Sequence, residues 1–299
     1  MKLATTTGDF GAYTVSQAEA VRCIRQAGFR YADYDFGKDY RLRNGAYQVD
    51  WLDYSQDLKR QAEEIGIRFV QAHSPMGKPI AEDNAEFIAD TIRCIEVCHQ
   101  LEIPNLVVHS GYAPGLSIEE TFERNKAFYR PLLEVAQRYG INILVENFNK
   151  MCIEGLYWID NAKDLRALID YIDHPNFHAV WDAGHGNLQE MPQHEELKLL
   201  GNHVLALHIQ DNMGEKDEHR MPLTGTLNLD SVMYGLQEIG YQGYFTFEAG
   251  SRFLPAEKRR PFPQDTRLAK ASLALRLKEE ELLYEIGKFI LESYGRYEE

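Results

Sequence analysis

Six apolar segments of this 299-residue chain each end in a side chain that can bind a metal ion. Imidazole nitrogens and carboxylate oxygens are the ligands that divalent cations take from proteins. Taken singly, a histidine at a strand end is more often a buried hydrogen-bonding residue, and an acidic residue there often caps the next helix. Six such residues in succession favour a shared metal site. They are His73, His109, Glu146, Asp182, His208 and Glu248.

Three of these residues, Glu146, Asp182 and Glu248, are carboxylates that follow apolar residues. Burying them around one opening without a cation would raise their pKa values or cost several kcal/mol. A divalent cation removes that penalty, so the residue types themselves indicate a metal.

The segment Val204–Gly225 combines an apolar strand pattern with a polar loop. The strand ends at His208, and the loop contains an Asp-x-His triplet followed by an arginine and a Pro-x-x-Gly turn. This arrangement is typical of a metal or substrate site at the end of a strand. Apart from His208, we expect its polar residues to line the substrate side of the site; they are Asp211, Asp217, His219 and Arg220.

Short apolar runs alternate with longer amphipathic segments along the whole chain. The predicted strands are Lys2–Thr6, Tyr31–Phe36, Arg68–His73, Asn105–His109, Asn142–Glu146, His178–Asp182, Val204–His208 and Tyr244–Glu248. The predicted helices are Ser16–Ala27, Tyr54–Ile65, Ala85–Leu101, Ile118–Tyr139, Ala162–Tyr171, His194–Leu200, Leu229–Ile239 and Thr266–Tyr294. Several helices stop at a glycine just before the next strand.

Eight strand–helix units in strict alternation predict an α/β fold with a parallel sheet closed into a (β/α)8 TIM barrel, a single domain over residues 1–299. An open doubly wound sheet is the alternative, but no glycine-rich nucleotide turn follows the first strand. In a barrel the carboxyl ends of all strands meet at one mouth, which would bring the six strand-end residues together. The segments Gly37–Trp51 and Gly250–Gln264 are longer than a connection needs and are candidate lids at that mouth.

The composition narrows the possible functions. A net charge of −14 argues against a nucleic-acid surface, which needs clustered lysine and arginine. Four cysteines are too few for a disulfide framework, and Cys94 and Cys98 are expected on a buried helix face. Neither a signal-peptide pattern nor a membrane-spanning apolar run is apparent, so we expect a cytoplasmic protein without a membrane partner. The amphipathic Thr266–Tyr294 segment could close the barrel or join subunits of a homo-oligomer.

Four motifs, LVENFN, VWDAGHGN, ALHIQDN with DEHRMPLTGTLNLD, and YFTFEA, resemble the xylose isomerase-like TIM-barrel superfamily. That superfamily includes sugar phosphate isomerases and epimerases, ketose 3-epimerases and the more distant endonuclease IV branch. The resemblance covers nearly the whole chain and specifies no substrate. It implies that the metal ligands are Glu146, Asp182, His208 and Glu248.

The same resemblance implies roles for the remaining polar residues. His185 matches a histidine that contacts the substrate, and Arg220 matches a basic residue that often reaches a substrate oxygen. His73, His109, Asp217 and His219 match additional zinc ligands of the endonuclease IV branch, but many sugar-handling members retain them, so we expect them to bind substrate.

Sugar isomerisation explains this set of residues chemically. Removing a proton beside a carbonyl group produces an enediolate, whose oxygens a divalent Mn²⁺, Mg²⁺, Co²⁺ or Zn²⁺ ion can stabilise. Glu146 and Glu248, on opposite sides of the substrate, would form the acid/base pair. The expected function is that of a metal-dependent isomerase or epimerase of carbohydrate metabolism. Its partner would be a small sugar or keto-sugar, with or without a phosphate group.

Three alternatives stay open at this point. One is a zinc phosphodiesterase similar to endonuclease IV, for which all ligand types are present. Another is a metal-dependent lyase that carries out β-elimination on a 3-keto sugar. The last is a barrel that binds a sugar acid as a sensor, although a sensor has no need of two glutamates.

Overall fold

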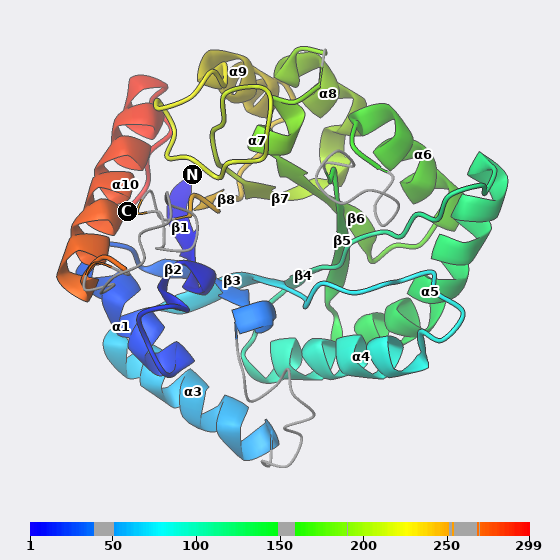
Figure 1. Ribbon diagram of the computed structural model, residues 1–299, viewed down its shortest axis with the longest axis horizontal. Helices are drawn as coiled ribbons and strands as arrows, with labels where there is room; N and C mark the ends of the chain where they lie inside the picture. Colours follow the sequence, from blue (N-terminus) through cyan, green and yellow to red (C-terminus); the bar gives the residue numbers. More distant parts are fainter. Residues whose placement is uncertain (39–50, 149–158, 190, 251–252, 254–267, 269) are drawn as a thin grey trace.

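Eight parallel strands form the ring at the centre of the computed structural model, which describes residues 1–38, 51–148, 159–189, 191–250, 253, 268 and 270–299 (Figure 1). The strands are β1 (Lys2–Thr6), β2 (Tyr31–Asp35), β3 (Arg68–His73), β4 (Asn105–Val107), β5 (Asn142–Glu146), β6 (Phe177–Asp182), β7 (Val204–His208) and β8 (Tyr244–Phe247). Each strand from β1 to β7 pairs with its sequence neighbour in that range, and β8 pairs with β1.

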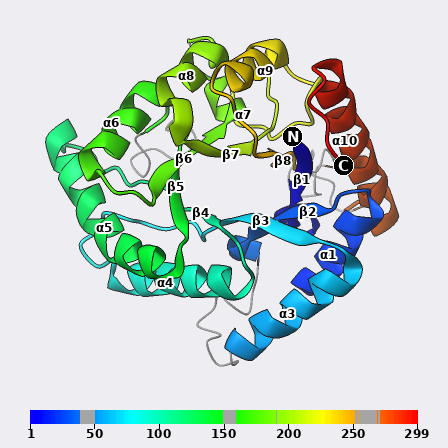
Figure 2. The same ribbon diagram turned by 180° about the vertical axis from the view of Figure 1, so that it is seen from behind.

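Helices surround this ring on the outside, as both views of the ribbon show (Figures 1 and 2). The helices are α1 (Gln17–Gln26), α3 (Trp51–Ile65), α4 (Ala85–Gln100), α5 (Ile118–Tyr139), α6 (Ala162–Ile172), α7 (Ala183–Gly186), α8 (Gln193–Leu200), α9 (Leu229–Glu238) and α10 (Leu273–Ser293). Short 3₁₀ helices η1 (Thr7–Phe10), η2 (Phe36–Lys38) and η3 (Gly201–His203) lie between them. The predicted (β/α)8 barrel is confirmed.

Backbone hydrogen bonds between β7 and β8 close the ring. The amide of Ile209 donates to Thr246 O at 2.8 Å, and the amide of Glu248 donates to Ile209 O at 3.1 Å. Because Ile209 directly follows His208, this closure fixes His208 and Glu248 on adjacent strand ends.

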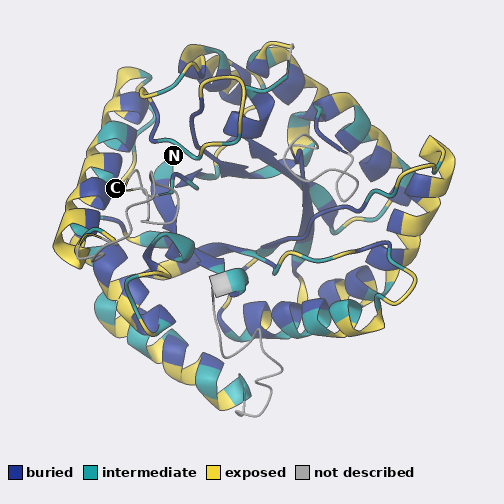
Figure 3. Ribbon diagram, in the orientation of Figure 1, coloured by how far each residue is buried: buried dark blue, intermediate teal, exposed yellow. Residues whose placement is uncertain are grey.

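The strands bury apolar residues on both faces. Ile143 and Val145 point outward into the large core between sheet and helices, whereas Leu144 belongs to a small inner cluster with Val107, Val180 and Ala206. The buried ring at the centre of Figure 3 reflects this double burial. Since side chains alternate along a strand, Glu146 points to the same inner side as Leu144.

The predicted strand and helix boundaries agree with the structure to within a few residues, except at the last helix. We predicted this helix from Thr266, but α10 begins at Leu273, and the described residues immediately before it are not helical. The hydroxyl of Ser272 accepts a hydrogen bond from the amide of Leu275 at 3.3 Å and caps the helix there. The prediction is therefore wrong for the described residues 268 and 270–272, whereas residues 266, 267 and 269 lie outside the described part of the chain.

Two further expectations concern the core and the loops. Cys94 and Cys98 are buried on α4, as predicted. The two candidate lids, Gly37–Trp51 and Gly250–Gln264, lie almost entirely outside the described residues. Within the described part of the chain, no helix is both long enough and apolar enough to span a bilayer.

Candidate functional site

A cavity of about 440 Å³ opens at the carboxyl ends of the strands. Its lining combines residues from six strand ends with Phe148 and with the loop that follows β7. The side chains that we predicted for the site and that line this cavity are His73, His109, Glu146, His185, Asp217, His219 and Glu248.

Four of the predicted residues converge at the floor of this cavity, where Glu146 and Glu248 line it and Asp182 and His208 are buried. Glu146, Asp182, His208 and Glu248 each offer one ligand atom, and these atoms all lie within 4.8 Å of one another. The Nδ1 atom of His208 is 2.8 Å from Glu146 Oε1 and 3.2 Å from Glu248 Oε2. The register of β6 and β7, which pairs Asp182 with His208, contributes to this convergence.

The two carboxylate oxygens of Asp182 have different surroundings. Oδ1 accepts a hydrogen bond from the amide of His185 at 2.7 Å and caps the short helix α7. Oδ2 is buried and has no hydrogen-bond partner among the described residues. Burial, with a smaller contribution from Glu146, raises the pKa of Asp182 to about 7 against the lowering effect of His185.

Glu146 also retains a buried oxygen, Oε2, without a hydrogen-bond partner among the described residues. Orphaned buried acceptors cost free energy unless a proton or a cation satisfies them. The oxygens of Glu146 and Asp182 and the nearby imidazole nitrogen of His208 therefore fit a divalent cation.

A series of hydrogen-bonded, buried side chains inside the barrel holds His208. We did not predict these contacts from the sequence. The Nε2 atom of His208 is 3.3 Å from Asp33 Oδ2, and the amide nitrogen of Gln71 donates to the same oxygen at 2.8 Å. Thr246 Oγ1 donates to Gln71 Oε1 at 3.1 Å. All four side chains are buried. A carboxylate behind a metal-binding histidine is a common means of fixing its ring.

Asp33 was missed because it lies inside β2 rather than at its end. The strand pairing shifts between Ala32 and Asp33, so that Asp33 lies opposite Gln71. Such an irregularity redirects side chains and cannot be inferred from a strand pattern. An acidic residue within the apolar stretch Tyr31–Phe36 was the available signal.

A second cluster lies nearer the opening and consists of His185, Asp217 and His219. One oxygen of Asp217 is 3.2 Å from the Nε2 atoms of both histidines, and the other accepts a hydrogen bond from Gln210 at 2.8 Å. Burial acts to raise the pKa of Asp217, but the hydrogen bonds from the two histidines hold it well below its ordinary value. Burial likewise opposes protonation of His185, yet Asp182 and Asp217 raise its pKa to about 9.

His73 and His109 lie on the other side of Glu146. Their nearest nitrogens are 3.6 Å and 3.4 Å from Glu146 Oε2. Burial lowers the pKa of His109 to about 3, whereas Glu146 and Glu248 overcome burial at His73 and raise its pKa to about 9. His73, Glu146 and His208 also form a group with metal-binding spacing.

Two residues of the Val204–Gly225 segment are directed elsewhere. The Arg220 guanidinium donates to Glu218 and to Thr224 O and does not belong to the cavity lining, so its predicted substrate contact stays a prediction. The expectation that Asp211 lines the substrate side is wrong. Its carboxylate accepts hydrogen bonds from backbone amides, including those of Gly225 at 2.8 Å and Leu227 at 3.0 Å, and so shapes the loop.

Aromatic residues near the site fall into two groups. Phe148 lines the cavity and makes an edge contact with His109, with ring centroids 4.8 Å apart. Trp181 is fully buried and donates from its indole nitrogen to Gln193 Oε1 at 2.7 Å, which agrees with the core position that we favoured. The tyrosines of residues 39–50 lie outside the described residues.

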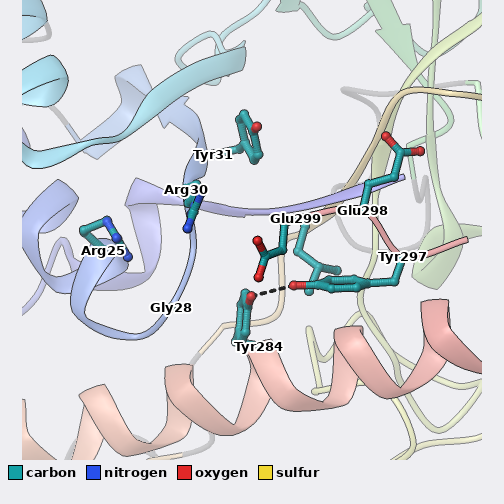
Figure 4. A pocket seen from close by; sticks show the side chains of 9 residues that line it. Arg25, Gly28, Arg30, Tyr31, Tyr284, Tyr297, Glu298 and Glu299 are labelled. Atoms are coloured by element: carbon teal, nitrogen blue, oxygen red, sulfur yellow. Dashed lines mark hydrogen bonds between the residues drawn. The ribbon is translucent and has the colours of Figure 1, made fainter.

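The opposite end of the barrel contains a much smaller hollow, of about 90 Å³ (Figure 4). Arg25, Tyr31, Tyr284 and Tyr297 surround it, and the hydroxyl groups of Tyr284 and Tyr297 are hydrogen-bonded at 2.8 Å. Its size does not suit a sugar, so the candidate functional site is the cavity at the carboxyl ends of the strands.

Comparison with known proteins adds independent findings. A family model described as a xylose isomerase-like TIM barrel matches residues 21–275. An uncharacterised protein of Methanocaldococcus jannaschii is 32% identical over 167 residues, which are 53% of this chain and 56% of that protein. A putative hydroxypyruvate isomerase of Danio rerio is 22% identical over 253 residues, covering 77% of this chain and 83% of that protein.

Among solved structures, a D-psicose 3-epimerase with D-tagatose from Clostridium cellulolyticum H10 superimposes with a TM-score of 0.74. The superposition covers 97% of this chain and 99% of that one, at 15% sequence identity. At this identity the likeness supports the fold.

Proposed function

Because the chain belongs to the xylose isomerase-like TIM-barrel family, we propose that it is a divalent-metal-dependent isomerase or epimerase of a small keto-sugar. The observation that carries this proposal is the convergence of Glu146, Asp182, His208 and Glu248 on one point at the cavity floor. In the proposal these four residues are the metal ligands. Their bound Mn²⁺, Mg²⁺, Co²⁺ or Zn²⁺ ion would supply Lewis-acid polarisation of the sugar carbonyl.

The two glutamates would transfer the proton at the carbon next to the carbonyl. Glu248 has a side chain that is 28% exposed and lines the cavity, so it can reach a bound sugar. Glu146 is 1% exposed and is surrounded by histidines that favour its ionised form. With one carboxylate taking a proton and the other returning it, the configuration at that carbon can be inverted.

The remaining cavity residues would bind and orient the sugar hydroxyl groups. His185 and His219 are held by the shared oxygen of Asp217, which fixes the direction of both rings. His73 and His109 extend the same lining beyond Glu146. Imidazole and carboxylate groups of this kind donate to and accept from sugar hydroxyl groups.

A zinc phosphodiesterase resembling endonuclease IV is the second candidate, since three groups with metal-binding spacing are present. The charge of the cavity argues against it. Among the described residues that line the central cavity there is no lysine or arginine, and the net charge of the chain is −14. A phosphodiester backbone needs cationic partners for binding.

Metal content distinguishes the two candidates. We expect the purified protein to contain about one Mn²⁺-type ion per chain, in keeping with a single four-ligand site. Elemental analysis of protein dialysed against each metal would measure this. About three zinc ions per chain would contradict the proposed function and favour the phosphodiesterase.

The Asp33→Asn substitution tests whether Asp33 positions His208 for metal binding. Asp33 can accept the Nε2–H of His208, which would leave the Nδ1 lone pair for the proposed cation beside Glu146. Asparagine retains the size but weakens this contact, and we expect metal affinity to fall by about 10- to 100-fold. Calorimetric titration with Mn²⁺ measures the change. Asp57→Asn, at an exposed position on α3, is the matched control, and equal affinities of the two variants would contradict the assignment.

A further inference from the structure

A second cavity, of about 370 Å³, adjoins the central one. Thr6, Asp35, His219 and Glu248 line both, so the two spaces meet beside the proposed acid/base residue Glu248. The central cavity alone lies within the usual size range of small-ligand sites. A small keto-sugar bound there would leave the second cavity free.

The described part of the second cavity has an aromatic and polar lining formed by the segment after β1 and the segment before α10. Lys270 donates to Ala12 O at 2.9 Å, and its ammonium group lies 5.6 Å from the centre of the Tyr13 ring. These contacts hold Tyr13 and Lys270 beside each other. Phe253 adds a second aromatic ring to the lining.

Asp9 forms a rigid part of the same wall. Its carboxylate oxygen Oδ2 is 2.9 Å from the buried Arg276 guanidinium, which also donates to Asp9 O at 3.2 Å. The Asp9 side chain is 7% exposed, so it is fixed in place. The cavity wall therefore does not depend on solvent-exposed side chains alone.

The charges in this cavity indicate which substituent would fit. Among its described lining residues, the carboxylates of Asp35 and Glu248 stand beside Lys270 and the imidazole of His219, and the carboxylate of Asp9 is already paired with Arg276. These described residues offer no cluster of cationic groups for a phosphate or carboxylate, and Lys270 over the Tyr13 ring disfavours a cation. Aromatic rings combined with hydrogen-bonding groups suit a neutral sugar ring, whose C–H face packs on the aromatic surface while its hydroxyl groups meet the polar atoms.

We infer that the substrate is a keto-sugar that carries a second, glycosidically linked sugar ring, and that the second cavity holds this ring. The inference rests on the proposed function, since the reacting unit occupies the central cavity. It narrows the substrate class from a monosaccharide to a keto-disaccharide or a glycoside of similar size.

The test compares kcat/KM for proton exchange on matched substrates. The extended substrates are the reducing keto-disaccharides maltulose, lactulose and isomaltulose. The references are D-fructose, D-psicose, D-tagatose and fructose 6-phosphate. We expect at least one disaccharide to exceed every reference by about tenfold or more, because the added ring gains contacts in the second cavity. Preference for a free ketose or for the phosphate would overturn the inference and leave the proposed function intact, whereas no exchange on any sugar overturns both.

A substitution in the second cavity tests whether the preference for disaccharides depends on that cavity. Tyr13→Ala should lower the ratio of disaccharide to free-ketose kcat/KM by about tenfold, since it removes the aromatic surface under the second ring. Tyr234→Ala, at an exposed position on α9, is the matched control and should leave the ratio unchanged. An unchanged ratio in Tyr13→Ala would contradict the assignment.

Discussion

Replacing Glu248 with glutamine is expected to lower sugar turnover by about 10²- to 10⁴-fold, the usual contribution of a general acid or base. The amide has the size of the carboxylate and retains one oxygen toward His208, but it cannot take up the substrate proton. Glu248 is the more exposed of the two glutamates and lines both cavities, so its loss removes the member of the acid/base pair that a bound sugar can reach more easily.

Three measurements on this variant distinguish a loss of proton transfer from a loss of sugar or metal binding. We expect turnover to fall by the factor given above. Sugar binding, measured by calorimetry, and metal content, measured by elemental analysis, should be partly retained. Glu238→Gln, an exposed position on α9, is the matched control and should be fully active. Full activity of Glu248→Gln would refute the two-glutamate mechanism.

The Arg276→Met substitution is expected to lower the free energy of unfolding by about 3–5 kcal/mol, because it leaves buried carboxylates without their cation. The guanidinium is fully buried and contacts Asp9 at 2.9 Å, Glu279 at 2.9 Å and Glu280 at 2.6 Å. Burial already raises the pKa values of Asp9 and Glu280 despite the lowering effect of Arg276. Without the arginine these pKa values would rise further.

Urea unfolding at several pH values measures this effect. When the pKa of a carboxyl is higher in the folded than in the unfolded protein, ionisation opposes folding, so the penalty grows as pH rises above the unfolded value. The destabilisation in Arg276→Met should therefore shrink toward acidic pH. Arg22→Met, an exposed position on α1 that donates to Gln61, should change stability by less than about 0.5 kcal/mol. Equal stabilities of the two variants would contradict the proposed role of Arg276.

The barrel could be predicted because each sequence pattern that indicates it lies within a single strand, helix or turn. Apolar runs alternate with amphipathic segments, and a glycine such as Gly140 ends its helix in a left-handed conformation, with φ of 68°. The start of α10 was not predictable from periodicity, since the helical pattern continues toward Thr266. The capping residue Ser272 was the better guide.

The candidate site was predictable where side chains stand at strand ends, since barrel closure alone brings Glu146, Asp182, His208 and Glu248 together. Their role as metal ligands stays a prediction. Asp33 and Asp211 could not be assigned in the same way. Asp33 depends on a shift in strand pairing, and the direction of the Asp211 side chain depends on how the following loop folds back.

Deuterium exchange from D₂O tests the central claim most directly. The protein, loaded with Mn²⁺, would be incubated with the ketoses and keto-disaccharides named above, and hydrogen replacement would be followed by nuclear magnetic resonance. We expect deuterium at the carbon next to the carbonyl of at least one sugar, and little or none with Glu248→Gln. Absence of exchange on every sugar would contradict the proposed function, and cleavage of DNA that contains abasic sites would then favour the phosphodiesterase.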